Sequence, residues 1–192
     1  MILDVLQTVV NFSYTKDQAG CSQINKHLYE SVYIYFLNKK ENIDQRIIEM
    51  RIFSKLVILN CSYNNKINNL NHLKNTLKIL NCCGCNKLNQ IGISELLFIE
   101  KLNCSYNCKI DNLNHLKNTL KILNCSGSSG VNQKGISELR FIEKLTCHKN
   151  KKIKDVNHLK NTLTMLDCSE CDGINQKGIS DRKSTRLNSS HE

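Results

Sequence analysis

Two pairs of cysteines in this 192-residue chain have the spacing of zinc ligands. Cys82 and Cys85 form one Cys-x-x-Cys pair, and Cys168 and Cys171 form the other. Two such pairs commonly hold a tetrahedral Zn²⁺ ion through their thiolates. A metal site is therefore the first chemistry to weigh against the rest of the sequence.

Three histidines recur at a constant step of 43 residues. His72, His115 and His158 each stand in a copy of the string Asn-His-Leu-Lys-Asn-Thr. Such a series is compatible with a metal-binding or catalytic cluster only if folding brings the three rings together. The constant step indicates that the histidines belong to an internal repeat of the chain.

An internal repeat accounts for both series. The string Leu-Asn-Cys-Ser-Tyr-Asn occurs twice and its divergent copy Leu-Thr-Cys-His-Lys-Asn once, and a second series falls between them, so that six units are spaced alternately 21 and 22 residues apart. The units start at Leu59, Leu80, Leu102, Leu123, Leu145 and Leu166. Leucine and cysteine alternate with polar residues, as in a short strand with one face inside. No unit can bury its apolar side alone, so the units are predicted to stack, with strands about 4.8 Å apart.

The pattern resembles the leucine-rich repeat, with cysteine in place of the third leucine, over residues 55–180. The resemblance implies an α/β fold: a solenoid with a curved parallel sheet of six units of 21 or 22 residues. In this family an asparagine is buried where the chain leaves each strand, and its amide binds backbone groups. This position is taken by Asn64, Asn107 and Asn150 in the odd units and by Cys85, Ser128 and Cys171 in the even units.

The repeat changes the interpretation of the cysteines and histidines. Each Cys-x-x-Cys pair joins an inward strand position to the asparagine position, and the two pairs lie four units, roughly 19 Å, apart. The histidines lie two units, roughly 10 Å, apart, too far to share one ion. We therefore predict no metal, no cofactor and, because no Ser-His-Asp pattern or phosphate loop appears, no catalytic residues. His148 differs, since its equivalents are serine or cysteine, and it is either a contact residue or drift.

Composition argues against nucleic-acid and membrane partners. The net charge is +10, but the densest lysine run, residues 149–154, has no interleaved aromatic residues that could stack on bases. No apolar stretch is long enough to cross a bilayer. The odd count of eleven cysteines and the absence of a signal peptide favour reduced thiols in an intracellular location, the cytoplasm or nucleus of a host. We expect a monomer apart from its partners.

Residues 1–40 have apolar spacing compatible with three short helices, at 3–12, 17–24 and 26–37. Their order resembles an F-box, the domain that binds a Skp-type adaptor of a cullin ubiquitin ligase. The resemblance implies adaptor contacts by Asp4, Val5, Leu6, Val9, Ile24, Lys26 and Leu28. The alternative is a helical cap over the first repeat. Residues 41–54 are predicted to form a linking helix, and the Asn- and Lys-rich combination looks like proteins of large DNA viruses of amoebae.

The last residues break the repeat. Back-translation of residues 181–191 allows a string that resembles a sequencing-library adapter, so we interpret residues 181–192 as read-through rather than native protein. The repeats are then expected to be truncated after Ser180.

These features predict a protein-binding module, a substrate receptor of a Skp-adaptor ubiquitin ligase that holds a target on its concave sheet. The alternative is a ubiquitin-independent scaffold that binds or sequesters a host protein. The expected concave contacts are Ile58, Asn60, Ser62, Asn81, Cys83, Asn103, Ser105, Asn124, Ser126, Thr146, His148, Asp167 and Ser169. The third pair of units, with Thr146, His148, Lys149 and Asp167, is where we expect specificity.

Overall fold

The computed structural model describes residues 36–37, 43–171 and 174, which all belong to one compact unit, Tyr33–Glu192. The predicted N-terminal helices lie outside the described residues except for Phe36 and Leu37, which form a strand and not the end of the helix predicted at 26–37. The F-box-like adaptor positions and residues 181–192 lie wholly outside the described residues.

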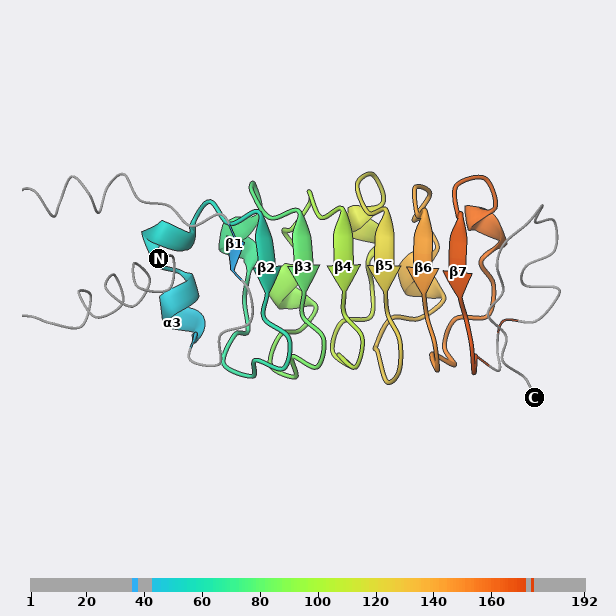
Figure 1. Cartoon of the computed structure of the whole chain (residues 1–192), viewed down its shortest axis with the longest axis horizontal. Coiled ribbons are helices and arrows are strands. Elements are labelled where there is room, and N and C mark those ends of the chain that lie inside the picture. Colours follow the sequence, from blue (N-terminus) through green and yellow to red (C-terminus); the bar gives the residue numbers. More distant parts are fainter. Residues whose placement is uncertain (1–35, 38–42, 172–173, 175–192) are drawn as a thin grey trace, which may run out of the picture. The chain divides into compact units, whose positions relative to one another are not determined.

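Seven parallel strands form one sheet in chain order (Figure 1). They are β1 (Phe36–Leu37), β2 (Ile58–Asn60), β3 (Ile79–Asn81), β4 (Lys101–Asn103), β5 (Ile122–Asn124), β6 (Lys144–Thr146) and β7 (Met165–Asp167). The register is constant, so that Leu59 pairs with Leu80 and Leu80 with Leu102. Every strand is therefore one step of a solenoid, as the repeat predicts.

Each of the strands β2 to β6 is followed by a tight turn and a return segment that contains a short 3-10 helix. After the first unit these helices are η2 (Asn71–Leu73), η3 (Ile91–Ile93), η4 (Asn114–Leu116), η5 (Lys134–Ile136) and η6 (Asn157–Leu159). Each return segment places apolar side chains against the inner face of the sheet; Leu70 and Leu73, for example, are fully buried. The interior is thus closed by the strands on one side and the return segments on the other.

The inward strand positions confirm the predicted core. The central leucines of β2 to β7 are at most 3% exposed, and the inward cysteines of the first five of these units are at most 4% exposed. These cysteines are Cys61, Cys82, Cys104, Cys125 and Cys147. Because leucine and thiol stack on their own copies one strand away, the core is a continuous apolar column.

The sheet begins one unit earlier than the repeat predicts. β1 pairs with β2, and residues 41–54 do not form a single linking helix. They contain α3 (Gln45–Ile48) and the 3-10 helix η1 (Arg51–Phe53), with Ile48, Ile52 and Phe53 buried. The segment is therefore a return segment of a seventh unit.

Gln45 shows the equivalence directly. Its Oε1 accepts the backbone N–H groups of Asn68 and Asn69, and its Nε2 donates to the Asn69 carbonyl at 2.8 Å. Gln90 and Gln133 make the same three bonds to the next return segment. Gln90 and Gln133 thus each hold an even unit of the described chain against the next unit, and Gln45 has the same role one unit pair earlier.

We expect Gln45→Ala to lower the free energy of unfolding by about 1 kcal/mol, because three hydrogen bonds to the next return segment and one to Glu49 are lost at a partly solvated site. Urea unfolding measures this, and Gln90→Ala provides the matched control within a repeat that is evident in the sequence. If Gln90→Ala destabilises the protein and Gln45→Ala does not, residues 43–54 are not an energetic part of the solenoid.

Candidate functional site

The buried turns fix the edge of the sheet where the strands end. Asn107 is completely buried, and its Nδ2 donates to the carbonyls of Cys85 and Leu88 at 3.0 and 3.1 Å. Asn150 bonds in the same way to Cys125 and Val131. The asparagine position therefore has the role predicted for it, holding one unit against the preceding one.

In the even units the prediction for this position is confirmed twice and is wrong once. Cys85 is buried, with its thiol 2.7 Å from the Cys61 carbonyl, and Cys171 is 2.7 Å from the Cys147 carbonyl. In the fifth strand's unit Ser128 is exposed, and Ser129 is the buried residue. The small residues of the Gly-Ser-Ser-Gly turn shift the chain by one position.

The outward side chains of the strands form a continuous surface, which we call the exposed sheet face. It consists of two parallel rows, because outward residues alternate with the inward leucines. The first row contains Phe36, Ile58, Ile79, Lys101, Ile122, Lys144 and Met165. The second contains Asn60, Asn81, Asn103, Asn124, Thr146 and Asp167.

The first row is mainly apolar and accessible. Phe36 and Met165 are 55% and 51% exposed, and Lys101 and Lys144 are also exposed. Sequence reasoning selected only Ile58 from this row. The missed signal was register, since every residue one position before a central leucine must face the same way.

The second row is an asparagine ladder. The Oδ1 atoms of Asn81, Asn103 and Asn124 accept the backbone N–H two residues further on, at 3.1 to 3.2 Å. Asp167 accepts the equivalent N–H of Ser169. Each side chain thereby terminates its own strand, which explains why the position is Asn or Asp in five of six units.

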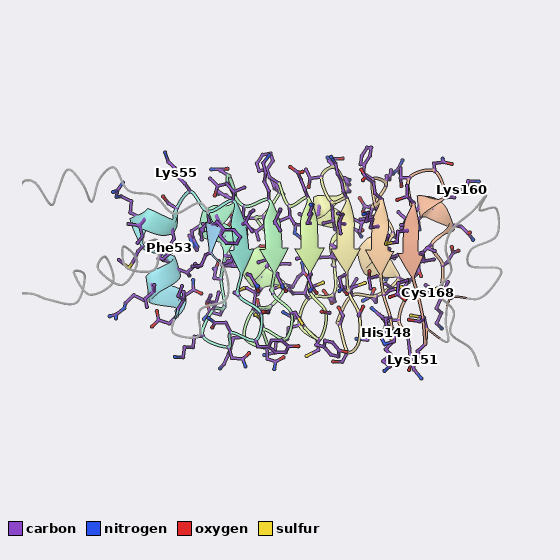
Figure 2. The ribbon with its side chains drawn as sticks, viewed as in Figure 1. Phe53, Lys55, His148, Lys151, Lys160 and Cys168 are labelled. Carbon is purple, nitrogen blue, oxygen red and sulfur yellow. The ribbon has the colours of Figure 1, made fainter. Side chains whose placement is uncertain are left out.

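Four predicted contact residues contribute little surface. Ser62, Cys83, Ser105 and Ser126 are between 4% and 8% exposed, because each lies in the tight turn that follows its strand. His148 and Ser169 occupy the same position in the last two units and are partly exposed. Figure 2 shows His148 and Lys151 together at the edge where the strands end, away from Lys55 and Lys160 at the opposite edge.

A polar network surrounds His148. The Ser169 hydroxyl donates to Asp167 Oδ1 at 2.7 Å, and Ser169 Oγ lies 2.6 Å from His148 Nδ1. The carboxylate of Glu170 is 3.7 Å from His148 Nε2 and 3.4 Å from the Lys149 ammonium. The Ser169 hydroxyl thus lies between an imidazole nitrogen and a carboxylate oxygen, and the network links side chains of the last two strand-bearing units.

The inward cysteines are buried thiols without the surroundings of a reactive cysteine. Burial raises the pKa of Cys104 to about 12 and raises the pKa of Cys82 and Cys125. The neighbouring Cys85 thiol and burial raise the pKa of Cys61, whose Sγ lies 3.9 Å from Cys85 Sγ. A raised pKa keeps each thiol protonated at neutral pH, and thiols in this form are poor nucleophiles and poor metal ligands.

Two of the three repeated histidines hydrogen-bond to the preceding unit. His72 Nε2 lies 3.1 Å from the Ile48 carbonyl and His158 Nε2 lies 3.0 Å from the Ile136 carbonyl. Burial lowers the pKa of both His72 and His115. Among the described residues no group of three or more His, Cys, Asp or Glu side chains is arranged to hold a metal ion, and no described helix is long and apolar enough to cross a membrane.

The lowered pKa of His115 predicts a pH dependence. Between its folded pKa and the unfolded value of about 6.5, the unfolded chain binds more protons, so stability falls as the pH drops through about 6.5. We expect urea unfolding midpoints to be lower at pH 5.5 than at pH 7.5. His115→Gln should reduce this difference, whereas an unchanged difference would exclude His115 as a source.

Comparison with known proteins gives a partial structural similarity. No protein-family model matches the chain, and no curated protein matches it. A solved structure, the functional domain of InlJ from Listeria monocytogenes, which includes a cysteine ladder, has a TM-score of 0.48 and 22% sequence identity. The match covers 79% of this chain and 38% of that chain. The in-register parallel sheet and the six sequence repeats identify the fold of the described residues as a leucine-rich-repeat solenoid.

Proposed function

We propose that the chain binds a protein partner through the exposed sheet face. The observation that carries the proposal is the first row, in which Ile58, Ile79, Ile122 and Met165 stand in register on the outside of the sheet. Each of these apolar side chains has surface exposed to solvent, although apolar side chains are usually buried. Solenoids use such extended surfaces for recognition, and an accessible apolar row marks an interaction site.

The finer proposal is a substrate receptor of a Skp-adaptor ubiquitin ligase. It rests on the sequence resemblance of residues 1–40 to an F-box, and those residues lie outside the described part of the chain, Phe36 and Leu37 excepted. In this role residues 1–40 bind the adaptor while the sheet face holds the target close to a partner enzyme, raising its effective concentration there. An intracellular location belongs to the same proposal.

The second candidate is a scaffold that binds a host protein without an adaptor. The finding that β1 and residues 43–54 already form a unit of the solenoid favours it in one respect. Part of the segment given to the F-box and linker by sequence reasoning serves the repeats instead.

Affinity capture with outward substitutions tests the role of the sheet face. The double variant Ile79→Asp and Ile122→Asp places two carboxylates in the first row, and Ile91→Asp, at a residue 74% exposed on η3, is the matched control. We expect partners recovered with the wild type and with Ile91→Asp to be lost with the double variant. Equal recovery with all three chains would exclude the face as the binding surface.

A separate capture tests the adaptor. Wild-type chain is expected to recover a Skp-type adaptor from a eukaryotic lysate, and Val5→Asp with Leu6→Asp is expected to abolish this. If no adaptor is recovered, or if the substitutions leave recovery unchanged, the ligase role is wrong and the scaffold is retained.

A further inference from the structure

We infer that the segment which binds the exposed sheet face is an acidic peptide segment, with carboxylates set among apolar side chains. The inference rests on the proposed function and adds the chemistry of the partner. It follows from charges and hydrogen-bond donors that the two rows leave unmatched.

Lys101 and Lys144 are the two charged residues of the first row. Four other lysines of the described chain form ion pairs with glutamates: Lys74 with Glu95 at 2.7 Å, Lys117 with Glu138 at 2.8 Å, Lys78 with Glu100 at 3.3 Å and Lys149 with Glu170 at 3.4 Å. Within the described ranges no carboxylate lies within ion-pair distance of Lys101 or Lys144, although both are exposed.

The residues just before the strands do not supply the missing charge. Lys78, Glu100, Lys121 and Glu143 precede β3 to β6 and alternate in sign. Glu100 and Glu143 are adjacent in sequence to Lys101 and Lys144, but Glu100 pairs with Lys78 at 3.3 Å and, in the described part of the chain, neither carboxylate forms an ion pair with the adjacent lysine. Both ammonium groups therefore remain available on the sheet face. A partner with carboxylates at two points roughly 10 Å apart, the spacing of alternate strands, matches them.

The asparagine ladder leaves donors rather than acceptors. Since the Oδ1 atoms of Asn81, Asn103 and Asn124 accept backbone N–H groups, each side chain presents its Nδ2 hydrogens outward. In the described part of the chain these hydrogens have no protein acceptor. Together with two ammonium groups, they make the centre of the face rich in donors, and its complement must be rich in acceptors.

The apolar neighbours favour a protein segment over a nucleic acid. Lys101 lies between Ile79 and Ile122 in register, and Lys144 lies between Ile122 and Met165. A phosphate backbone would satisfy the two lysines but would bury these apolar side chains against charge. A peptide with both carboxylates and apolar side chains satisfies all of them.

Selection from a displayed library of random peptides tests the inference. We expect wild-type chain to select peptides rich in Asp or Glu together with bulky apolar residues. The Kd of a selected synthetic peptide should rise at least about tenfold in the double variant Lys101→Glu and Lys144→Glu. Lys87→Glu with Lys160→Glu, which makes the same change of net charge at exposed sites outside the strands, should leave the Kd nearly unchanged.

The outcomes separate the two proposals. Selected peptides without acidic residues, bound equally by wild type and by Lys101→Glu with Lys144→Glu but lost in Ile79→Asp with Ile122→Asp, would overturn the acidic partner and keep the binding face. If every selected peptide still binds the double variant Ile79→Asp with Ile122→Asp, both the acidic partner and the binding face are overturned. A single-stranded or duplex oligonucleotide that competes for Lys101 and Lys144 with steep salt dependence would overturn the peptide in favour of a nucleic acid. Thermal melting of every variant checks that it folds.

Discussion

Asn107→Ala is expected to lower the free energy of unfolding by about 3 to 5 kcal/mol. The substitution removes the buried donor to the Cys85 and Leu88 carbonyls and the acceptor of the Lys109 N–H, which is 3.1 Å from Oδ1. Water cannot replace the amide without opening the turn, because Asn107 is completely buried. The loss is therefore larger than that of an average surface hydrogen bond.

Two further variants show whether the amide is responsible. Asn118→Ala changes an exposed asparagine of a return segment and should alter the free energy of unfolding by less than about 0.5 kcal/mol. Asn107→Cys should fall between the two, since Cys85 fills the same position with one bond to a carbonyl. Urea unfolding measures all three, and equal losses for Asn107→Ala and Asn118→Ala would show that the buried amide contributes nothing specific.

The sequence predicts the core of this fold well because the core obeys two simple periods. Alternation within each strand places Leu80 and Cys82 inside, and the 21- or 22-residue step brings each copy beside the next. Both rules follow from strand geometry and need no knowledge of the turns.

The first unit escaped prediction because its spacing is shifted. From Leu37 to Ile43 the chain is two residues shorter than from Leu80 to Leu88, and the return segment is two residues longer. The strand step of 22 residues is therefore preserved while the internal positions move. The isoleucines of this segment fit a helical period, but their neighbours in space are those of a return segment. Gln45, which matches Gln90 and Gln133 in its contacts, was the signal available.

The sheet face was predicted in part for a related reason. Polar residues after a strand are expected to be exposed contact residues, but Ser62 and Ser105 are buried in the turn that follows each strand. Ile79 and Ile122 look like core residues in a linear sequence, but the register puts them outside. In each strand only one of the two adjacent apolar residues can face inward. The leucines that recur at every 21 or 22 residues are the inward ones, so the residue before each of them faces outward.

Close packing between successive return segments leads to the second large effect, which is expected for Gly135→Ala. A Cβ at this position would overlap the backbone carbonyl of Asp111 and stand 3.0 Å from Asn112 Cα. The Gly135 carbonyl also accepts the N–H of Leu113 at 2.8 Å, so the two segments cannot separate without losing that bond. Since backbone must move, we expect a loss of about 3 kcal/mol or more.

Gly127→Ala is the informative comparison, because its obstacle is a side chain. The added Cβ would meet the ring of Tyr106, which is 48% exposed and can rotate away, so the main penalty is the positive φ of +67°. That conformation costs about 1 kcal/mol for a residue with a Cβ. Urea unfolding should therefore rank Gly135→Ala well below Gly127→Ala in stability. The reverse order would mean that the return segments are spaced more loosely than the backbone contact between Gly135 and Asp111 requires.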